Sequence, residues 1–352
     1  MVPSKESDSR GRTGPMTHCR EEHDDTGTSA IFAPARVCGL MFVVCGEALY
    51  DLFGVTDGER DGMRFEGCRG GSPFNVALGM ARLGTPVALF TGLSTDMLGQ
   101  NLFGVLRDEG VETRHLVRSS RSTTLSVVAV DASGSPSYTF YGIGSSDCSI
   151  GVADLPVLGT EVAGLHFGSY SIAVEPVASA MAALASRERH RFISLDPNVR
   201  PTVEPDMGIW RGRTDAMRRL ASVVKVSEED MAALYPGDDP ERRLAEWASD
   251  GPALVILTRG QGDIVAMRGR DTLRVTPRTV TVVDTVGAGD AFQASLLASI
   301  CDHAEPRRWL ETASRDALRR IVERAGMAAG IVCGRRGADL PHTHDLHADA
   351  TA

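Results

Sequence analysis

The composition of this chain is that of an ordinary folded protein, and it excludes several classes. Its 352 residues are 42% hydrophobic and 24% charged, which excludes collagen and disorder along the whole chain and allows one large core or two domains. A formal net charge of -9 argues against a nucleic-acid-binding protein, which normally presents a basic face. A small anionic substrate is still compatible with this charge, because local backbone amides can bind an anion.

Both ends of the chain lack the pattern of a folded domain. Residues 1–36 are rich in Ser, Arg, Asp, Glu and Gly, so we expect a disordered tail, and we expect a second tail over 342–352. The N-terminal segment has no hydrophobic core of a signal peptide, and its acidic residues argue against a transit peptide. Translation from Met16 or Met41 is a hypothesis that deletion of residues 1–30 would test.

The cysteines and the apolar segments indicate a cytoplasmic protein. The seven cysteines are scattered and include no C-x-x-C pair, which favours reduced thiols. No apolar stretch reaches about 18 residues, so we expect no membrane span and no membrane partner. Three histidines near the C-terminus, His342, His344 and His347, fit a solvated tail better than a metal site.

The first strand and its sequel predict a ligand site. Residues 42–46 are a short apolar run that ends in glycine, which is typical of a buried parallel strand. Asp51 follows in the expected loop, and in open α/β sheets ligands bind beyond the carboxyl ends of the strands. Asp51 is therefore a candidate to bind two hydroxyls of a polyol, and a solvated loop acid is the alternative.

A glycine pair precedes the first expected helix. Gly70 and Gly71 would let the backbone approach a ligand closely, and Asn75 offers both a donor and an acceptor. A plain turn with a helix cap explains the same residues. The pattern continues with helices over 75–83 and 98–109 around a strand at 87–90, which are β-α repeats.

A small separate sheet is expected in the first half of the chain. Strands at 123–130 and 137–141 are joined by turn residues at 131–134, and a further strand lies near 63–67. An exposed sheet of this kind also favours a homodimer, because strand edges can pair.

Polar residues follow two strands of the second half, after an expected strand at 165–168 and a helix at 177–187. The strand at 192–195 leads into DPNVR, whose Asp, Asn and Arg200 suit a phosphate and magnesium neighbourhood, with a capped turn as the alternative. The strand at 223–226 precedes Ser-Glu-Glu-Asp, so Asp230 either bears on magnesium through water or belongs to a helix cap.

The stretch TVTVVDTVGAGDAFQASLLASI, residues 279–300, predicts a strand that turns into a helix. The small residues Gly287, Ala288 and Gly289 leave the amides of the first helical turn open to an anion, so that a phosphate could be held without any lysine. Asp290 is then either a favourable helix-start charge or a general base beside an anion site. The sequence contains no P-loop motif G-x-x-x-x-G-K-[ST], and no G-x-G-x-x-G motif follows an expected strand.

Two of these stretches resemble the signatures of one family. DTVGAGDAF is similar to the C-terminal signature, and GGSPFNVA to the N-terminal signature, of the ribokinase-like, or PfkB, sugar kinases. The resemblance implies a three-layer α/β sandwich over 37–341, with a mainly parallel central sheet and a small β-sheet lid formed from about 50–70 and 121–142. GEALYD, LHFGSYSIAVEP and DPNVR are most similar to bacterial fructokinases.

The resemblance also implies roles for single residues. Asp290 would be the catalytic base, with Gly287, Ala288 and Gly289 as the anion site. The sugar would be held by Asp51, Gly70, Gly71 and Asn75. The nucleotide would be held by Thr258, Gly260, Arg200 and Asp230. Asp284 is a candidate ligand of a potassium ion.

The expected reaction is transfer of the γ-phosphate of ATP, with Mg2+, to a primary hydroxyl, most simply that of D-fructose. Ribose, 2-keto-3-deoxygluconate or a nucleoside is an alternative acceptor, and a non-catalytic regulator with the same fold is another. Two departures leave details open. Residues 227–230 replace the family's Asn-x-x-Glu, and Asp339 follows the final Gly-Ala where ribokinases have Ser, so potassium dependence is undecided.

Overall fold

The structure is a computed structural model that describes residues 40–55, 63–130 and 136–348. The chain divides into two units, residues 1–35 and 36–352, and all described residues belong to the second. The expected tail at 1–36 and the hypothesis about its start at Met16 therefore lie outside the described residues.

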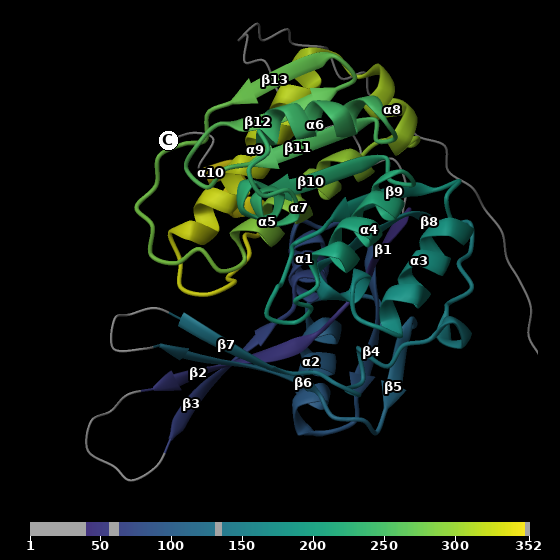
Figure 1. The fold of residues 1–352 in the computed structure, drawn as a ribbon, viewed down its shortest axis with the longest axis vertical. Coiled ribbons are helices and arrows are strands. Elements are labelled where there is room, and N and C mark those ends of the chain that lie inside the picture. Colours follow the sequence, from purple (N-terminus) through teal and green to yellow (C-terminus); the bar gives the residue numbers. More distant parts are fainter. Residues whose placement is uncertain (1–39, 56–62, 131–135, 349–352) are drawn as a thin grey trace, which may run out of the picture. The chain divides into compact units, whose positions relative to one another are not determined.

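A nine-stranded sheet forms the middle layer of this unit (Figure 1), in the order β13-β12-β11-β10-β9-β8-β1-β4-β5. All neighbouring pairs are parallel except β11 with β12 and β12 with β13. The strands are β1 (Met41–Cys45), β4 (Val87–Ser94), β5 (Leu116–Ser119), β8 (Val162–Gly168), β9 (Phe192–Asp196), β10 (Val223–Ser227), β11 (Leu254–Thr258), β12 (Ile264–Arg268) and β13 (Asp271–Val275).

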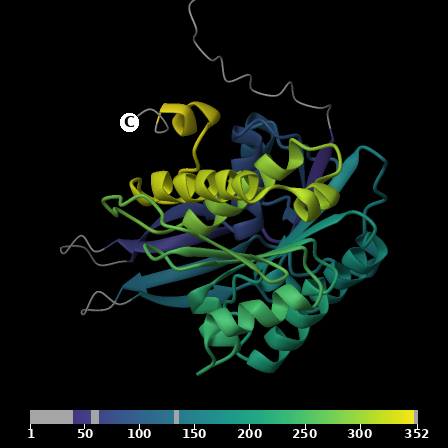
Figure 2. The ribbon, with the colours of Figure 1, turned by 90° about the horizontal axis from the view of Figure 1, so that it is seen from above.

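Helices cover both faces of the sheet, as Figure 2 shows from above. Phe42 and Val44 of β1 join the core on one face, and Val43 and Cys45 join the core on the other. The first face carries α1 (Ser72–Arg82), α2 (Met97–Asp108), α7 (Ala288–Cys301), α8 (Pro306–Thr312), α9 (Arg315–Cys333) and α10 (Thr343–Ala348). The second carries α3 (Val177–Arg187), α4 (Met207–Arg218), α5 (Glu228–Leu234) and α6 (Pro240–Ser249).

The expected three-layer arrangement is confirmed. Apolar strands such as β1 are buried along their whole length because helices cover both faces of the sheet. The helix expected over 177–187 has the observed bounds of α3.

A second sheet of four strands, in the order β3-β2-β6-β7, stands apart from the first (Figure 1). Its strands are β2 (Leu49–Val55), β3 (Arg64–Gly70), β6 (Thr124–Val130) and β7 (Pro136–Tyr141). The expectation of a small separate sheet is confirmed. The expectation of a loop at Asp51 was wrong, because Asp51 lies within β2 and pairs with Cys68 of β3 and Ser126 of β6.

Two further expectations need correction. The valines at 280–283 form no strand; the segment is irregular, and Val283 donates its amide hydrogen only to the Cys333 carbonyl, while Val282 lies in a cavity lining. The C-terminal segment is more than a tail, because residues 343–348 form α10 and Leu346 is buried against the core. A β-branched run and a His-rich segment are weak local signals that tertiary contacts override.

The described residues contain no helix that is long and apolar enough to cross a membrane. Within the same ranges, no group of three or more His, Cys, Asp or Glu side chains is arranged to hold a metal ion. Five cysteines belong to the described part and all are free thiols: Cys45, Cys68, Cys148, Cys301 and Cys333.

Candidate active site

Two adjoining cavities open at the carboxyl ends of the parallel strands. The first has a volume of about 520 Å³ and lies against the four-stranded sheet β3-β2-β6-β7, which we call the lid sheet. The second has a volume of about 760 Å³ and lies between β10, β11 and α9. The two share lining residues from two segments, 198–201 and 285–289: Asn198, Arg200, Pro201, Thr285 and Gly289. Two ligands could therefore meet where the cavities join.

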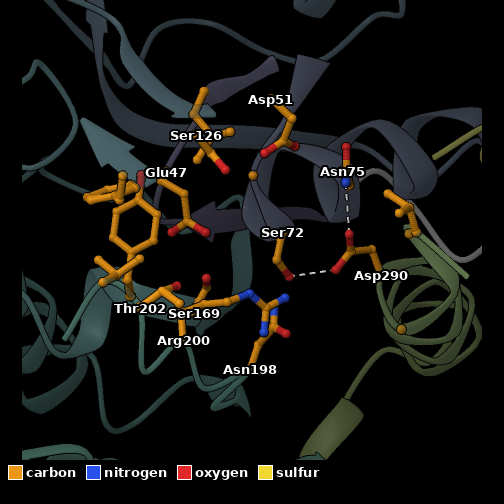
Figure 3. A pocket seen from close by; sticks show the side chains of 18 of the residues that line it. Glu47, Asp51, Ser72, Asn75, Ser126, Ser169, Asn198, Arg200, Thr202 and Asp290 are labelled. Atoms are coloured by element: carbon orange, nitrogen blue, oxygen red, sulfur yellow. Dashed lines mark hydrogen bonds between the residues drawn. The ribbon is translucent and has the colours of Figure 1, made fainter. Parts of the chain in front are cut away.

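The first cavity contains most of the residues expected to bind a sugar. Asp51, Gly71 and Asn75 line it, and the lid sheet also contributes Ser126 and Phe140. Figure 3 shows the carboxylate of Asp51 and the hydroxyl of Ser126 on the same side of this space. The cavity thus combines polar groups with aromatic walls, which suits a small polyol.

The glycines before α1 have different roles in this cavity. Gly70 does not line it; a Cβ at this position would lie 2.3 Å from Oδ2 of Asp51, so glycine makes room for the carboxylate. Gly71 has a φ of 102°, and a Cβ there would lie 2.8 Å from the Glu47 carbonyl oxygen. Only glycine is compatible with this backbone, which starts α1 next to the cavity.

Asp51 is a half-buried acid on the lid. Burial raises the pKa of its carboxyl, while a hydrogen bond with Ser126 and the charge of Arg200 lower it. The carboxylate faces the cavity with part of its hydration removed, as expected of a group that exchanges water for sugar hydroxyls.

The N-terminus of α7 lies where the two cavities meet. Gly287 caps the helix in the left-handed region with a φ of 82°, and a Cβ there would lie 2.6 Å from the Ala338 Cβ. Gly287 and Gly289 line the first cavity, and Ala288 and Gly289 line the second. The Ala288 amide donates to the Thr285 carbonyl at 3.2 Å. The amides of Gly289 and Asp290 follow in the first helical turn, where amides have no partner within their helix and can bind an anion.

Asp290, the third residue of α7, is buried beside this turn. Its two carboxylate oxygens accept hydrogen bonds from Ser72 Oγ at 2.6 Å and Asn75 Nδ2 at 2.8 Å (Figure 3). Burial raises the pKa of Asp290, and Ser72, Asn75, Lys225 and Arg200 all counteract that shift. The result is an oriented carboxylate that can accept a proton from a hydroxyl in the first cavity.

Two of these contacts were not expected from the sequence. Ser72 lies within the quoted signature, but nothing in the spacing indicates that it contacts a residue 218 positions away. Asn75 was expected to bind the sugar, and its amide nitrogen instead donates to Asp290, which leaves its other groups for a ligand.

A buried lysine, which the sequence analysis did not include among the site residues, also reaches this site. Lys225 Nζ lies 2.9 Å from Oδ2 of Asp196, and a Cβ on Gly289 would lie 3.2 Å from Nζ. Burial opposes the lysine charge, but the carboxylates of Asp196, Asp230 and Asp290 outweigh it and raise its pKa. Burial raises the pKa of Asp196 to about 6, against the lowering effect of Lys225. Lys225 therefore places a positive charge next to the α7 turn.

The second cavity contains all four residues expected at the nucleotide: Thr258, Gly260, Arg200 and Asp230. Asp230 lies in the first turn of α5 and accepts a hydrogen bond from the Val199 amide at 2.8 Å, which links the two polar strand ends. Opposite them, α9 presents the small residues Gly326, Ala329 and Gly330. A flat apolar wall facing polar strand ends suits a purine nucleotide.

Asp284 lines neither cavity. Its carboxylate accepts hydrogen bonds from the amides of Val286 at 3.1 Å and Gly337 at 2.9 Å. Burial opposes its charge, but these backbone donors prevail and lower its pKa. The carboxylate ties the α7 turn to the segment after α9, and its assignment to a potassium ion stays a prediction.

Comparison with known proteins identifies the family of this chain. Residues 40–345 match the model of the pfkB family carbohydrate kinases. The chain belongs to this family. It is 36% identical over 283 residues to the fructokinase of Rhizobium leguminosarum bv. trifolii, covering 79% of this chain and 86% of that protein. This pfkB protein is accordingly a carbohydrate kinase.

Solved structures of other family members have the same fold. A fructokinase from Xylella fastidiosa with bound ATP has a TM-score of 0.80 at 24% identity, covering 90% of this chain and all of that one (100%), which shows the ribokinase-like fold. A fructokinase from Vibrio cholerae O395, solved with fructose, ADP and a calcium ion, has a TM-score of 0.76 at 27% identity. The match covers 88% of this chain and 99% of that one. The kinase fold of this chain is thus shared by enzymes that bind nucleotide and a metal ion.

Proposed function

We propose that this carbohydrate kinase phosphorylates D-fructose at its 6-hydroxyl with ATP. The observation that carries the proposal is the position of Asp290, which lines the polar cavity under the lid and directly follows Gly289, a residue that lines both this cavity and the one with the apolar wall. Fructose is favoured as the acceptor because fructokinases are among the family members to which this chain is similar.

In the proposed reaction, Asp290 accepts the proton of the sugar hydroxyl as its oxygen attacks the γ-phosphorus. A new phosphorus–oxygen bond forms, the bond from the γ-phosphorus to the β–γ bridging oxygen breaks, and ADP leaves with the electron pair. The amides of Gly289 and Asp290 and the ammonium of Lys225 stabilise the charge on the phosphoryl oxygens. Arg200 lines both cavities, so its guanidinium can interact with the phosphoryl group before and after transfer.

Mg2+ fits the acidic end of the second cavity. Glu229 and Asp230 line it, and Mg2+ commonly uses one or two carboxylates together with substrate phosphates and water. Bound there with ATP, the ion would neutralise phosphate charge.

We further propose that the lid sheet forms a homodimer contact. Apolar side chains are exposed on or next to its strands, and Met63 and Tyr141 retain 82% and 61% of their accessible surface. Groups of exposed apolar side chains on a sheet favour association.

The test of the acceptor is ATP-dependent phosphorylation over a panel: fructose, ribose, 2-keto-3-deoxygluconate, glucose, adenosine and fructose 6-phosphate, each with and without potassium. Preference for fructose by at least about 10-fold in kcat/KM supports the proposal. Preference for another member replaces fructose with that acceptor. No turnover of any acceptor, with ATP still bound, supports the non-catalytic regulator instead. A potassium requirement would support the assignment of Asp284.

The test of the base is the substitution Asp290→Ala. We expect kcat to fall by a factor on the order of 10² or more, with a modest change in the KM for the sugar, because proton transfer belongs to the transition state. The matched control is Asp302→Ala, which removes an exposed carboxylate at the opposite end of the same helix, outside both cavities. An unchanged kcat in Asp290→Ala would refute the assignment.

A further inference from the structure

Glu47 is a buried acid in the first cavity that the proposed phosphoryl transfer does not use. It follows β1, is only 1% exposed, and lines the cavity together with Asp51 and Ser169. Its Oε2 atom is buried and has no hydrogen-bond partner among the residues that the structure describes. Buried polar atoms are normally paired, so an unpaired oxygen facing a ligand cavity indicates a group that the ligand completes.

The surroundings of Glu47 favour its uncharged form. No ion pair to Glu47 is found within the described ranges, and Asp147 adds a like charge. Burial raises the pKa of Glu47 to about 8, although the Ser169 side chain and the charge of Arg200 lower it. Tyr170 and Cys148 are the other titratable groups that face it, and burial raises the pKa of both, so they stay neutral.

The local backbone holds Glu47 in this place. Gly46 has a φ of 149°, and a Cβ there would lie 2.3 Å from Cγ of Pro73 and 2.9 Å from Oγ of Ser171. Ser169 itself has a φ of 58°, a strained value for a residue other than glycine. The strained backbone of Ser169, which contacts the carboxyl, and the close packing at Gly46, which precedes Glu47, are typical of residues held in place for a ligand.

Glu47 and the proposed base occupy different sides of the cavity. Glu47 lies beside Ser169, with which its side chain interacts. In the view of Figure 3 Asp290 lies at the opposite side, and Ser72 lies between the two acids. A sugar whose reacting hydroxyl approaches Asp290 therefore presents its other end to Glu47.

We propose that Glu47 is a recognition residue, whose Oε2 hydrogen-bonds a sugar hydroxyl remote from the hydroxyl that is phosphorylated. This inference rests on the proposed function and deepens it. For fructose phosphorylated at C6, the partner is the 1-hydroxyl or the anomeric 2-hydroxyl. The protonated carboxyl donates through Oε2 at neutral pH, and the donor is lost when the group ionises.

The experiment compares Glu47→Ala and Glu47→Gln with the wild type on fructose, 1-deoxyfructose and 2,5-anhydromannitol, which lacks the anomeric hydroxyl. In Glu47→Ala we expect the KM for fructose to rise roughly 10-fold or more, with kcat and the KM for ATP changed less than about 3-fold. The loss should shrink for the analogue that lacks the bound hydroxyl. Glu47→Gln keeps a donor and should restore most of the affinity.

The pH profile separates recognition from a purely structural role. Wild-type kcat/KM for the sugar should fall above about pH 8 as Glu47 ionises, and Glu47→Gln should not show this fall. The matched control is Glu188→Gln, a buried glutamate at the end of α3 that is ion-paired with Arg191 and lies outside both cavities. It should lower Tm without changing the KM for the sugar.

Two results would overturn the inference: an unchanged KM in Glu47→Ala, or equal losses on all three sugars with a lower kcat. If Glu47→Ala does not fold, the test is the fall of kcat/KM at alkaline pH in Glu47→Gln. A fall identical to that of the wild type would reject the recognition role of Glu47. If the wild type prefers another sugar, fructose is rejected as the substrate and the same comparison is made on the preferred sugar and its deoxy forms.

Discussion

Opposing effects act on the carboxyl of Asp290. Burial favours its protonated form, and the donors Ser72 and Asn75 favour the ionised form that can accept a proton. The same two donors fix its orientation. A base of this kind loses activity as the pH falls through its pKa, so each donor extends the working range toward acidic pH.

Ser72→Ala removes one donor and should raise the pKa of Asp290. The ratio of variant to wild-type kcat/KM should fall to roughly one tenth at acidic pH and recover as the pH rises, since a hydrogen bond to a charged group contributes about 1.5–3 kcal/mol. Ser299→Ala is the control, because its hydroxyl donates to the Ser295 carbonyl of the same helix and lies outside both cavities. A parallel loss at all pH values would show that Ser72 acts in another way.

Three neighbouring strands and one helix position the proposed catalytic and binding groups. Asp196 and Thr258 are the last residues of β9 and β11, Lys225 lies in the middle of β10, and α7 supplies the proposed anion-binding turn. The turn is constrained by Gly287, which has a left-handed φ and a close neighbour in Ala338. Any side chain there must displace the segment after α9 or the start of α7.

Gly287→Ala should therefore lower both stability and kcat. The left-handed backbone alone costs about 1–3 kcal/mol for alanine, and the contact with Ala338 adds to it. We expect a lower Tm and a kcat reduced about 10-fold or more. Gly237→Ala is a matched control, because Gly237 has the same φ of 82° and no atom within 4 Å of an added Cβ. Equal effects of both substitutions on kcat would exclude a role for the position of α7.

At the scale of the whole molecule, the lid sheet forms one wall of the first cavity and also carries exposed apolar groups. Phe53 and Phe140 line the cavity, whereas Met63 and Phe65 are exposed. Contact of two lids would bury the exposed groups and would also steady the wall around the sugar.

The variant Met63→Glu/Phe65→Glu should be monomeric where the wild type is dimeric, because charges would be buried in the contact. Sedimentation velocity over a range of concentrations measures the effect. Val157→Glu is the control, since Val157 is 91% exposed outside the lid. A wild type that is monomeric at all concentrations, or a double variant that remains dimeric, would contradict the lid contact.

Local patterns of the sequence determined the fold class, and most of the site residues that they predict line the two cavities. The apolar runs of the parallel strands, the glycine pair at 70–71 and the turn before Asp290 identify buried strands and strand-to-helix turns, which depend on neighbouring residues only. They could not reveal the partners of Asp290, because Ser72 is 218 positions away. They also missed β12 and β13, and they placed Asp51 in a loop, although the family resemblance includes it in the lid strands.

Only the tertiary structure decided which polar groups are buried together. Lys225 is one lysine on an apolar strand until the fold places it against Asp196 and Gly289. Glu47 is a polar residue after a strand until the lid and the segment at Ser169 enclose it. Burial changes the pKa of such groups and the strength of their interactions, and burial depends on chain segments that are distant in sequence.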